Sequence, residues 1–363
     1  MRYNSIRPGE VWLDTNGKRI QAHGFSVFYN EKDSCYYWYG ENKEYTRDRT
    51  TVWHWGVRCY ASKDLYNWED KGLIIPPHTD DLDSPLHPTY HMDRPHIIYC
   101  EKTGKYVAWL KIMCSQTSQF MSVLQADDFL GPYEFVHKVY KPLAMDTGDF
   151  DLQIDHNTGK AYFIFDRPHF EIVAATLDDT YTSVTGEYSE HFQGLLPPVS
   201  REAPACFQRN GKWYMFTSST TGKWSNPSQV CEFKGFHGEY RDLGDACLGD
   251  KTNTTFNSQI SCVLKVPGKD LYIACADRWR PGKKNVTKSQ WFYRFVKLSA
   301  KNPGYKKYVK VDREPKEAHP LPGEKRWNKD NTWCSDYVWL PVEWIGGKPV
   351  LRWRDEWRVE DIL

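Results

Sequence analysis

The 363-residue chain lacks several features that would each indicate a particular class of protein. It has no excess of charge of one sign, since 48 Lys and Arg residues face 47 Asp and Glu residues. This balance excludes a sequence-independent nucleic-acid binder, which needs clustered cations. No run approaches the roughly 18–20 apolar residues of a membrane-spanning helix, so no membrane partner is expected. Residues 1–12 contain no apolar signal-peptide core, which predicts a cytoplasmic protein, or a periplasmic or secreted one if a signal was removed.

The 10 cysteines form no C-x-x-C pair, which argues against a zinc ribbon or a thioredoxin-type site. Several of them, including Cys59, Cys206, Cys262 and Cys275, lie within apolar runs. Buried free thiols are therefore predicted in preference to a disulfide framework. No EF-hand or H-E-x-x-H pattern occurs, so no metal site is predicted. The sequence gives no indication of the oligomeric state.

Aromatic residues are abundant, with 16 Trp, 23 Tyr and 17 Phe. Short aromatic and β-branched runs alternate with Gly, Asn and Asp turns, and helical periodicity is almost absent, which is typical of an all-β protein. One hairpin-like pattern, an apolar run, a turn and an aromatic run, occurs six times. Its copies cover residues 25–39, 95–110, 150–165, 203–217, 260–274 and 337–353.

A spacing of roughly 50–70 residues between hairpins is typical of propeller blades with four strands each. We therefore predict one domain over residues 1–363, a five-bladed β-propeller with a C-terminal closing hairpin. Six blades and a β-sandwich are the alternatives. The first strand of each blade lines the central axis, so the residues that precede the hairpins should gather at one end of it. These are His23, Arg94, Asp149, Glu202, Gln259 and Asp336.

Two acidic residues from different blades, near many Trp and Tyr residues, indicate glycoside hydrolysis of an oligo- or polysaccharide. In this reaction one protonated carboxyl group assists the leaving oxygen, while a second group activates water or attacks the sugar. The reaction uses only water, so no cofactor is expected. Whether the axis of the propeller holds a Ca²⁺ ion is left open by the sequence.

Seven motifs carry a resemblance to a known family: IQAHG (20–24), YYWYGEN (36–42), DRPHIIY (93–99), REAPA (201–205), FNSQ (256–259), ADRW (276–279) and YVWLPV (337–342). With these motifs the chain resembles glycoside hydrolase family 43 over nearly its whole length. The resemblance implies a five-bladed propeller and an inverting mechanism. It is similar to the branch that acts on arabinogalactan-type glycans, which includes exo-β-1,3-galactanases and related arabinofuranosidases and galactofuranosidases.

The resemblance also implies catalytic roles. Glu202 matches the general acid, and Asp149 matches the carboxylate that raises the pKa of the acid, with Asp151 on the same strand as the alternative. The usual base, an Asp in the first blade, is missing, because Ala22-His23-Gly24 stands there. Gln259 matches the amide that is thought to hold the attacking water in the galactanases. Glu41 and Asp93 are the alternative bases.

Further residues are expected to bind substrate. Asp93 stands where the galactanases carry Glu, and its shorter side chain favours a furanosidase over a galactanase. The aromatic residues Trp38, Trp53 and Trp279 are candidate stacking platforms, with core packing as the alternative for each. The loops over residues 43–54 and 75–92 should wall the site and close one end, which predicts an exo-acting enzyme. The remaining substrate-binding candidates are His23, Glu41, Trp55, Asp151, Asp277, Arg278, Asp336 and Trp339.

The sequence thus predicts an inverting exo-glycosidase that releases a terminal galactosyl or arabinofuranosyl unit from arabinogalactan-type plant glycans. The missing base leaves a non-catalytic carbohydrate-binding propeller as the alternative. A protein-interaction propeller is disfavoured, because the blades lack the Trp-Asp endings of such scaffolds.

Overall fold

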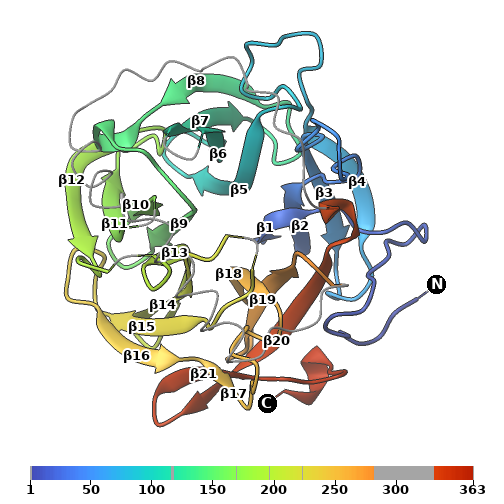
Figure 1. Cartoon of the computed structure of the whole chain (residues 1–363), viewed down its shortest axis with the longest axis vertical. Coiled ribbons are helices and arrows are strands. Elements are labelled where there is room, and N and C mark those ends of the chain that lie inside the picture. Colours follow the sequence, from blue (N-terminus) through green and yellow to red (C-terminus); the bar gives the residue numbers. More distant parts are fainter. Residues whose placement is uncertain are drawn as a thin grey trace.

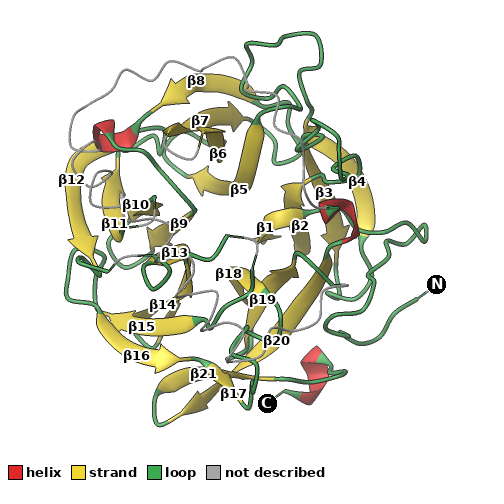
Figure 2. Ribbon diagram, in the orientation of Figure 1, coloured by secondary structure: helices red, strands yellow, loops and turns green. Residues whose placement is uncertain are grey.

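The computed structural model describes residues 2–115, 118–168, 170–195, 197–222, 224–281 and 331–362. Five antiparallel sheets surround a central axis as the blades of a propeller (Figures 1 and 2). Blade 1 contains β1 (His23–Asn30), β2 (Cys35–Glu41), β3 (Val57–Ser62) and β4 (Glu69–Ile75). Blade 2 contains β5 (His91–Cys100), β6 (Lys105–Ser115), β7 (Ser118–Ala126) and β8 (Glu134–Tyr140). Blade 3 contains β9 (Phe150–Asp155), β10 (Lys160–Arg167), β11 (Glu171–Leu177) and β12 (Val184–His191).

Blade 4 contains β13 (Arg201–Arg209), β14 (Lys212–Ser219), β15 (Gln229–Phe233) and β16 (Arg241–Asp245). Blade 5 contains β18 (Gln259–Lys265), β19 (Tyr272–Arg278), β20 (Asp336–Ile345) and β21 (Lys348–Arg352), and the short β17 (Cys247–Leu248) pairs in parallel with β21 at its outer edge. Three short 3₁₀ helices, η1 (Pro142–Ala144), η2 (Thr332–Cys334) and η3 (Val359–Asp361), complete the described secondary structure.

The five-bladed prediction is confirmed, and the sixth hairpin explains why five is the right number. β20 pairs with β19 and then with β21, so the C-terminal hairpin supplies the outer half of blade 5 and closes the ring there. It does not start a sixth sheet. The other five hairpins form the inner halves of the five blades.

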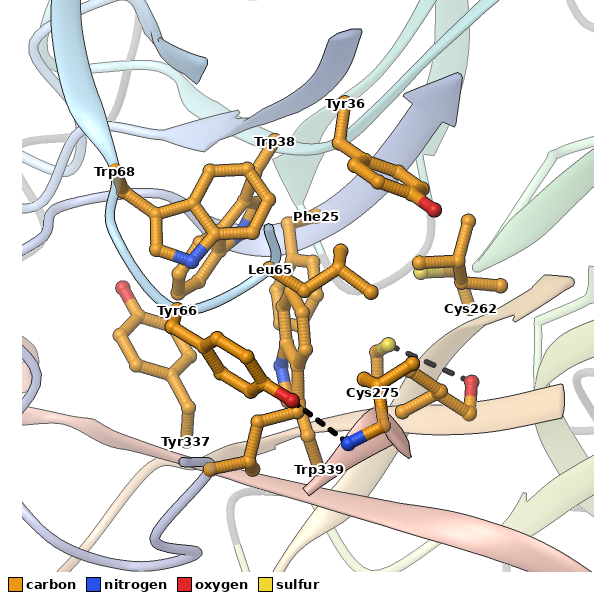
Figure 3. Packing of buried hydrophobic residues seen from close by; sticks show 14 of the residues in the cluster. Phe25, Tyr36, Trp38, Leu65, Tyr66, Trp68, Cys262, Cys275, Tyr337 and Trp339 are labelled. Atoms are coloured by element: carbon orange, nitrogen blue, oxygen red, sulfur yellow. Dashed lines mark hydrogen bonds between the residues drawn. The ribbon is translucent and has the colours of Figure 1, made fainter. Parts of the chain in front are cut away.

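The seam between the first and the last blade is filled by aromatic rings (Figure 3). Trp38 of β2 packs against Tyr337 and Trp339 of β20, with ring centroids 4.5 and 4.8 Å apart. Trp12 of the N-terminal segment lies against the same cluster, 5.1 Å from Trp339. Trp38 and Trp339 are completely buried, so the structure corrects their assignment as sugar-binding platforms, and both are core residues.

Segments near the two ends of the described chain meet at this seam. Ile6 and Trp357 form an isolated antiparallel bridge. The amide of Gly9 donates to the carbonyl of Tyr337 at 2.6 Å. Contacts between segments from both ends of the sequence therefore stabilise the closed ring.

Irregularities in the inner strands orient the residues at the axis. The register shifts directly after His23, Asp93 and Glu202, where Gly24, Arg94 and Ala203 have φ values of 51°, 48° and 54°. Such bulges bend a strand and redirect its side chains, and they are frequent next to active sites. Proline, which has no N–H to donate, follows two of these positions, at 95 and 204.

Two further sequence predictions can be compared with the structure. The nine cysteines described are free thiols, eight of them buried, as the sequence predicted. Among the described residues, no helix has the length and apolar character needed to cross a membrane.

Candidate active site

Glu202 stands at the start of β13, at the end of the axis where the inner strands begin. Its side chain is half-buried, and the pKa of its carboxyl group lies well above the usual range. Burial is the largest cause, and the negative charges of Asp149 and Asp166 add to it. A carboxyl group in these surroundings holds its proton at neutral pH, which is the state that a general acid needs.

Asp149 immediately precedes β9 and belongs to the neighbouring blade. Its Oδ2 atom lies 2.9 Å from Nε of Arg94, and its Oδ1 atom accepts a hydrogen bond of 2.7 Å from Nζ of Lys111. Burial alone would raise the pKa of Asp149, but these two cations lower it to about 2. Asp149 is therefore a fixed negative charge beside Glu202, and it raises the pKa of the acid as the sequence resemblance implies.

Both cations come from blade 2. The position of Arg94 before a hairpin predicted that it lies at the axis, but its sequence position gave it no role, and Lys111 was not predicted at all. Arg94 follows Asp93 on β5 and is buried. On β6, Lys111 is flanked by the apolar residues Trp109, Leu110, Ile112 and Met113, and its side chain is also buried. A lone lysine in an apolar strand was the available signal, because a buried ammonium group needs an anionic partner.

Gln259 opens β18 in blade 5, and its amide group is held from both sides. Its Nε2 atom donates to Oγ of Ser218 at 2.9 Å, and its Oε1 atom accepts from Nε1 of Trp279 at 3.1 Å. Each end of the amide keeps further hydrogen-bonding capacity, since the NH₂ has a second proton and the oxygen a second lone pair. The side chain is half-buried, so it can hold a water molecule but, as a neutral amide, is a weak base.

Asp93 on β5 is a half-buried carboxylate contributed by blade 2. Its Oδ1 atom accepts a hydrogen bond of 2.7 Å from Nε1 of Trp53, and its Oδ2 atom lies 3.6 Å from Nζ of Lys111. Burial acts to raise its pKa, but Lys111 and Lys43 lower it below the usual value. This makes Asp93 a poor base and a good acceptor for a sugar hydroxyl.

The loops over residues 43–54 and 75–92 meet beside Asp93. Trp53 from the first loop stacks on His91 with ring centroids 3.7 Å apart. Its amide donates to the carbonyl of Pro88 in the second loop at 2.8 Å. In the first loop, the half-buried Trp55 packs edge-on against Tyr45, 4.9 Å away. These contacts are those expected of two loops that wall one side of the site.

Glu41 lies behind the site and does not reach its surface. The side chain is only 2% exposed, Oε1 accepts from the amide of Arg94 at 3.0 Å, and Oε2 lies 2.5 Å from Nζ of Lys43. A Cβ atom on Gly24 would lie 2.2 Å from Oε1, so only glycine fits there. Burial raises the pKa of Glu41 to about 7, against the influence of Lys43. Glu41 thus stabilises the backbone of β5 from inside the protein. The structure therefore corrects its assignment as a base or a sugar ligand.

His23, which stands in place of the missing base, is completely buried. Its Nδ1 atom lies 3.0 Å from Oδ1 of Asp277, and its ring stacks on Tyr337 at 5.0 Å. Asp277 is also completely buried, and its Oδ2 atom accepts from the amide of Gly24 and the hydroxyl of Ser261. The structure therefore corrects both assignments: the pair fixes the backbone of β1 and cannot contact a sugar.

Two of the remaining substrate-binding candidates, Asp151 and Asp336, are buried in contacts within the protein. Asp151 is 3% exposed and accepts from the amide of Cys206 at 2.7 Å, so of the two aspartates on this strand only Asp149 faces Glu202. Asp336 is buried in an ion pair with Arg19 at 2.7 Å and does not lie on an inner strand. The half-buried Arg278 donates to the carbonyl of Phe256 at 2.9 Å.

Charged groups from all five blades thus surround the end of the axis where the inner strands begin, and we call them the axial charge cluster. Six of them are carboxyl groups and three are cations, so the cations can neutralise only half of the carboxylates. The raised pKa values of Glu41, Asp166 and Glu202 agree with this imbalance. The cluster consists of Glu41, Asp93, Asp149, Asp166, Glu202 and Asp277 with Lys43, Arg94 and Lys111. Within the described ranges, no group of three or more His, Cys, Asp and Glu side chains is arranged to hold a metal ion.

The chain is similar in sequence and in fold to several known proteins. The sequence model of "Glycosyl hydrolases family 43" matches residues 19–275. A solved β-1,3-galactosidase of this family is 28% identical, with a TM-score of 0.75 over 98% of the chain, which spans 64% of the length of that protein. A second one, solved with galactodeoxynojirimycin, is 26% identical, with a TM-score of 0.74 over 97% of this chain and 100% of that one. The exo-β-1,3-galactanase of Phanerochaete chrysosporium, at 24% identity and a TM-score of 0.74 over 98% of this chain and 68% of that one, shares the fold. No curated protein sequence matches the chain significantly.

Proposed function

The chain belongs to glycosyl hydrolase family 43, and we propose that it is an exo-acting member that releases terminal galactosyl units from β-1,3-linked galactan of the arabinogalactan type. Membership in the family makes the chain a glycosidase that inverts the anomeric configuration. The galactosyl specificity is supported by the two β-1,3-galactosidases that are 28% and 26% identical to it. Closure of one side by the two loops that meet at Trp53 supports exo action.

The observation that carries the proposal is the placement of one protonated and one ionised carboxyl group on neighbouring blades. Glu202 keeps its proton because it is buried beside Asp149, and Asp149 stays ionised because Arg94 and Lys111 hold it. Environments that drive two carboxyl pKa values apart are the usual signature of acid and anion roles in one site.

The proposed reaction uses these groups in a single displacement. Glu202 transfers its proton to the glycosidic oxygen as the bond from that oxygen to C1 breaks. A water molecule held by the Gln259 amide attacks C1 from the opposite face, and its excess proton passes to solvent. Asp149 remains charged throughout. Its charge keeps the pKa of Glu202 high, so Glu202 takes up a proton from solvent after each turnover. The product is a galactose of inverted configuration.

A furanosidase is the second candidate, and Asp93 is the observation that favours it. Asp93 is shorter than the Glu of galactanases, and both of its oxygens face protein groups, Nε1 of Trp53 and Nζ of Lys111. Asp93 can still accept a hydrogen bond from a sugar hydroxyl, but its side chain is one methylene shorter than Glu and extends less far toward the sugar ring. The same site then suits a terminal arabinofuranosyl or galactofuranosyl unit.

A substrate panel separates the two candidates. The protein would be incubated with β-1,3-galactobiose and with the 4-nitrophenyl derivatives of β-D-galactopyranose, β-D-galactofuranose, α-L-arabinofuranose and β-D-xylopyranose. Release of galactose from galactobiose supports the proposal. Release from a furanoside alone replaces it with the furanosidase. Binding of galactan without release of any sugar would instead identify a carbohydrate-binding propeller.

A further inference from the structure

Asp166 is a buried carboxyl group that the proposed reaction does not use. It lies near the end of β10 and is 2% exposed. Its backbone pairs with the turn that carries Asp149, since the amide of Gly148 donates to the carbonyl of Asp166 at 2.7 Å and the amide of Asp166 donates to the carbonyl of Asp149 at 2.9 Å. These backbone hydrogen bonds therefore hold Asp166 next to Asp149 at one end of the inner hairpin of blade 3.

The carboxyl group of Asp166 packs directly on the backbone of Gly148. A Cβ atom on Gly148 would lie 2.2 Å from Oδ2 of Asp166 and 2.6 Å from Oδ1, so any other residue would displace the group. Oδ1 is buried and makes no hydrogen bond to another described residue. The backbone of Asp149 hydrogen-bonds the carboxyl group, but a buried carboxyl oxygen without a partner still lowers the stability of the fold. Stability alone therefore does not explain an acidic residue here.

Three members of the axial charge cluster act on Asp166, and they come from β5, β6 and the turn before β9. Lys111 on β6 and Arg94 on β5 attract its negative charge, whereas Asp149 in the turn before β9 repels it. Glu202 on β13 is in turn influenced by both Asp149 and Asp166. Burial and Asp149 outweigh the two cations and raise the pKa of Asp166 to about 8.

We propose that Asp166 is a positioning residue that sets the pH range in which Glu202 can act as the acid. The inference rests on the proposed function. Both Asp166 and Glu202 keep their protons at neutral pH beside the ionised Asp149, so whichever ionises first as the pH rises opposes the ionisation of the other. When Asp166 loses its proton, its charge opposes the ionisation of Glu202, so Glu202 remains protonated to a higher pH than burial beside Asp149 alone would allow. Asp166 does this without contacting the substrate.

The test replaces Asp166 by Asn, which has the same shape and carries no charge. The pH at which Glu202 loses its proton is measured by infrared titration of the carboxylic-acid C=O band, assigned as the band that Glu202→Gln removes. Because a like charge has been removed, we expect the Glu202 titration to move to lower pH by about one unit. The basic limb of kcat/KM should shift in the same direction, while kcat at the optimum changes little.

Asp151→Asn is the matched control. Asp151 is equally buried and its pKa is also raised, to about 7, but it faces the amide of Cys206 and does not influence Glu202. It should leave the Glu202 titration in place. If Asp166→Asn does not fold, as judged by circular dichroism, Asp166→Ala is the second variant.

A Glu202 titration that is the same in wild type and both Asp166 variants would overturn the proposal. The infrared measurement needs no substrate, so it tests Asp166 even if no galactoside is hydrolysed. A shifted Glu202 band in a protein that releases no sugar supports the role of Asp166 while contradicting the proposed function.

Discussion

The Nε atom of Arg94 lies 2.9 Å from Oδ2 of Asp149, and the two residues belong to neighbouring blades. This ion pair crosses the gap between the inner strand of blade 2 and the turn that leads into blade 3. Arg94 can reach Asp149 because the bulge after Asp93 gives it a left-handed backbone with φ of 48°. By pairing with Asp149, Arg94 helps to keep this carboxylate ionised, as the proposed reaction requires.

Lys111 is the second cation that keeps Asp149 ionised, and the Lys111→Met variant tests this role. Loss of the ammonium group raises the pKa of Asp149, because one of the two nearby positive charges disappears. We expect the acidic limb of kcat/KM to move to higher pH by about one unit and kcat to fall about 10- to 100-fold. Lys105→Met is the control, since Lys105 lies on the same strand in an exposed ion pair with Asp127. Equal profiles for both variants and the wild type would contradict the role of Lys111.

Gln259→Ala should reduce kcat by about 10²- to 10⁴-fold, the usual contribution of a group that handles a proton or positions the water. Ser218→Ala should have a smaller effect, about 10-fold, because Gln259 keeps its hydrogen bond to Trp279 and loses only the one to Ser218. Steady-state kinetics on the best substrate measures both. A Gln259→Ala enzyme as fast as the wild type would remove Gln259 from the mechanism and direct attention to Asp93.

Trp339→Ala tests the aromatic seam that closes the ring. Trp339 is completely buried against Trp38, Phe25 and Trp12, so its truncation leaves a large cavity. We expect the free energy of unfolding to fall by about 3–5 kcal/mol in urea denaturation. Trp353→Ala is the control, because Trp353 is 38% exposed and should cost less than about 1 kcal/mol. Equal losses in both variants would mean that the seam does not carry this stability.

The fold should lose stability in acid through its buried neutral histidines. Burial is the main cause that lowers the pKa of His54 and of His96 to about 3 each. Between pH 6.5 and 3 the unfolded chain binds protons that the folded protein excludes, so the stabilisation is complete above pH 6.5 and decreases as the pH falls. Each group contributes a slope of about 1.4 kcal/mol per pH unit in that window.

His54→Gln should therefore flatten the dependence of the melting temperature on pH between 6 and 4. His156→Gln, at an exposed turn position, is the control and should follow the wild type. A melting temperature of the wild type that is constant over this range would contradict the buried neutral state of these histidines.

The sequence was sufficient to predict the blades and to bring Glu202 and Asp149 together, while the catalytic roles of these residues and of Gln259 stay predictions. Five of the six hairpin turns contain Gly, and the spacing of the hairpins predicts which strands are innermost. Glu202, Asp149 and Gln259 precede or open three of those strands, so position in the repeat alone brings them to the same end of the axis.

What the sequence could not predict is how deep each polar side chain lies. His23 and Asp277 stand next to the axis like Glu202, but the bulge at Gly24 turns them toward each other and away from solvent. Alternation along a strand predicts the face of a side chain only while the register is regular. Aromatic residues show the same limit, because Trp339 and Trp279 were both candidates for sugar binding, but Trp339 is completely buried and only Trp279 contacts Gln259.

The central claim is that Glu202 drives an inverting release of galactose, and proton NMR of β-1,3-galactobiose during hydrolysis tests it most directly. The account predicts that α-galactose appears first from the β-linked disaccharide and later equilibrates with the β-anomer. Glu202→Gln should give no galactose over the same time. Initial release of β-galactose, or undiminished release by Glu202→Gln, would contradict the account.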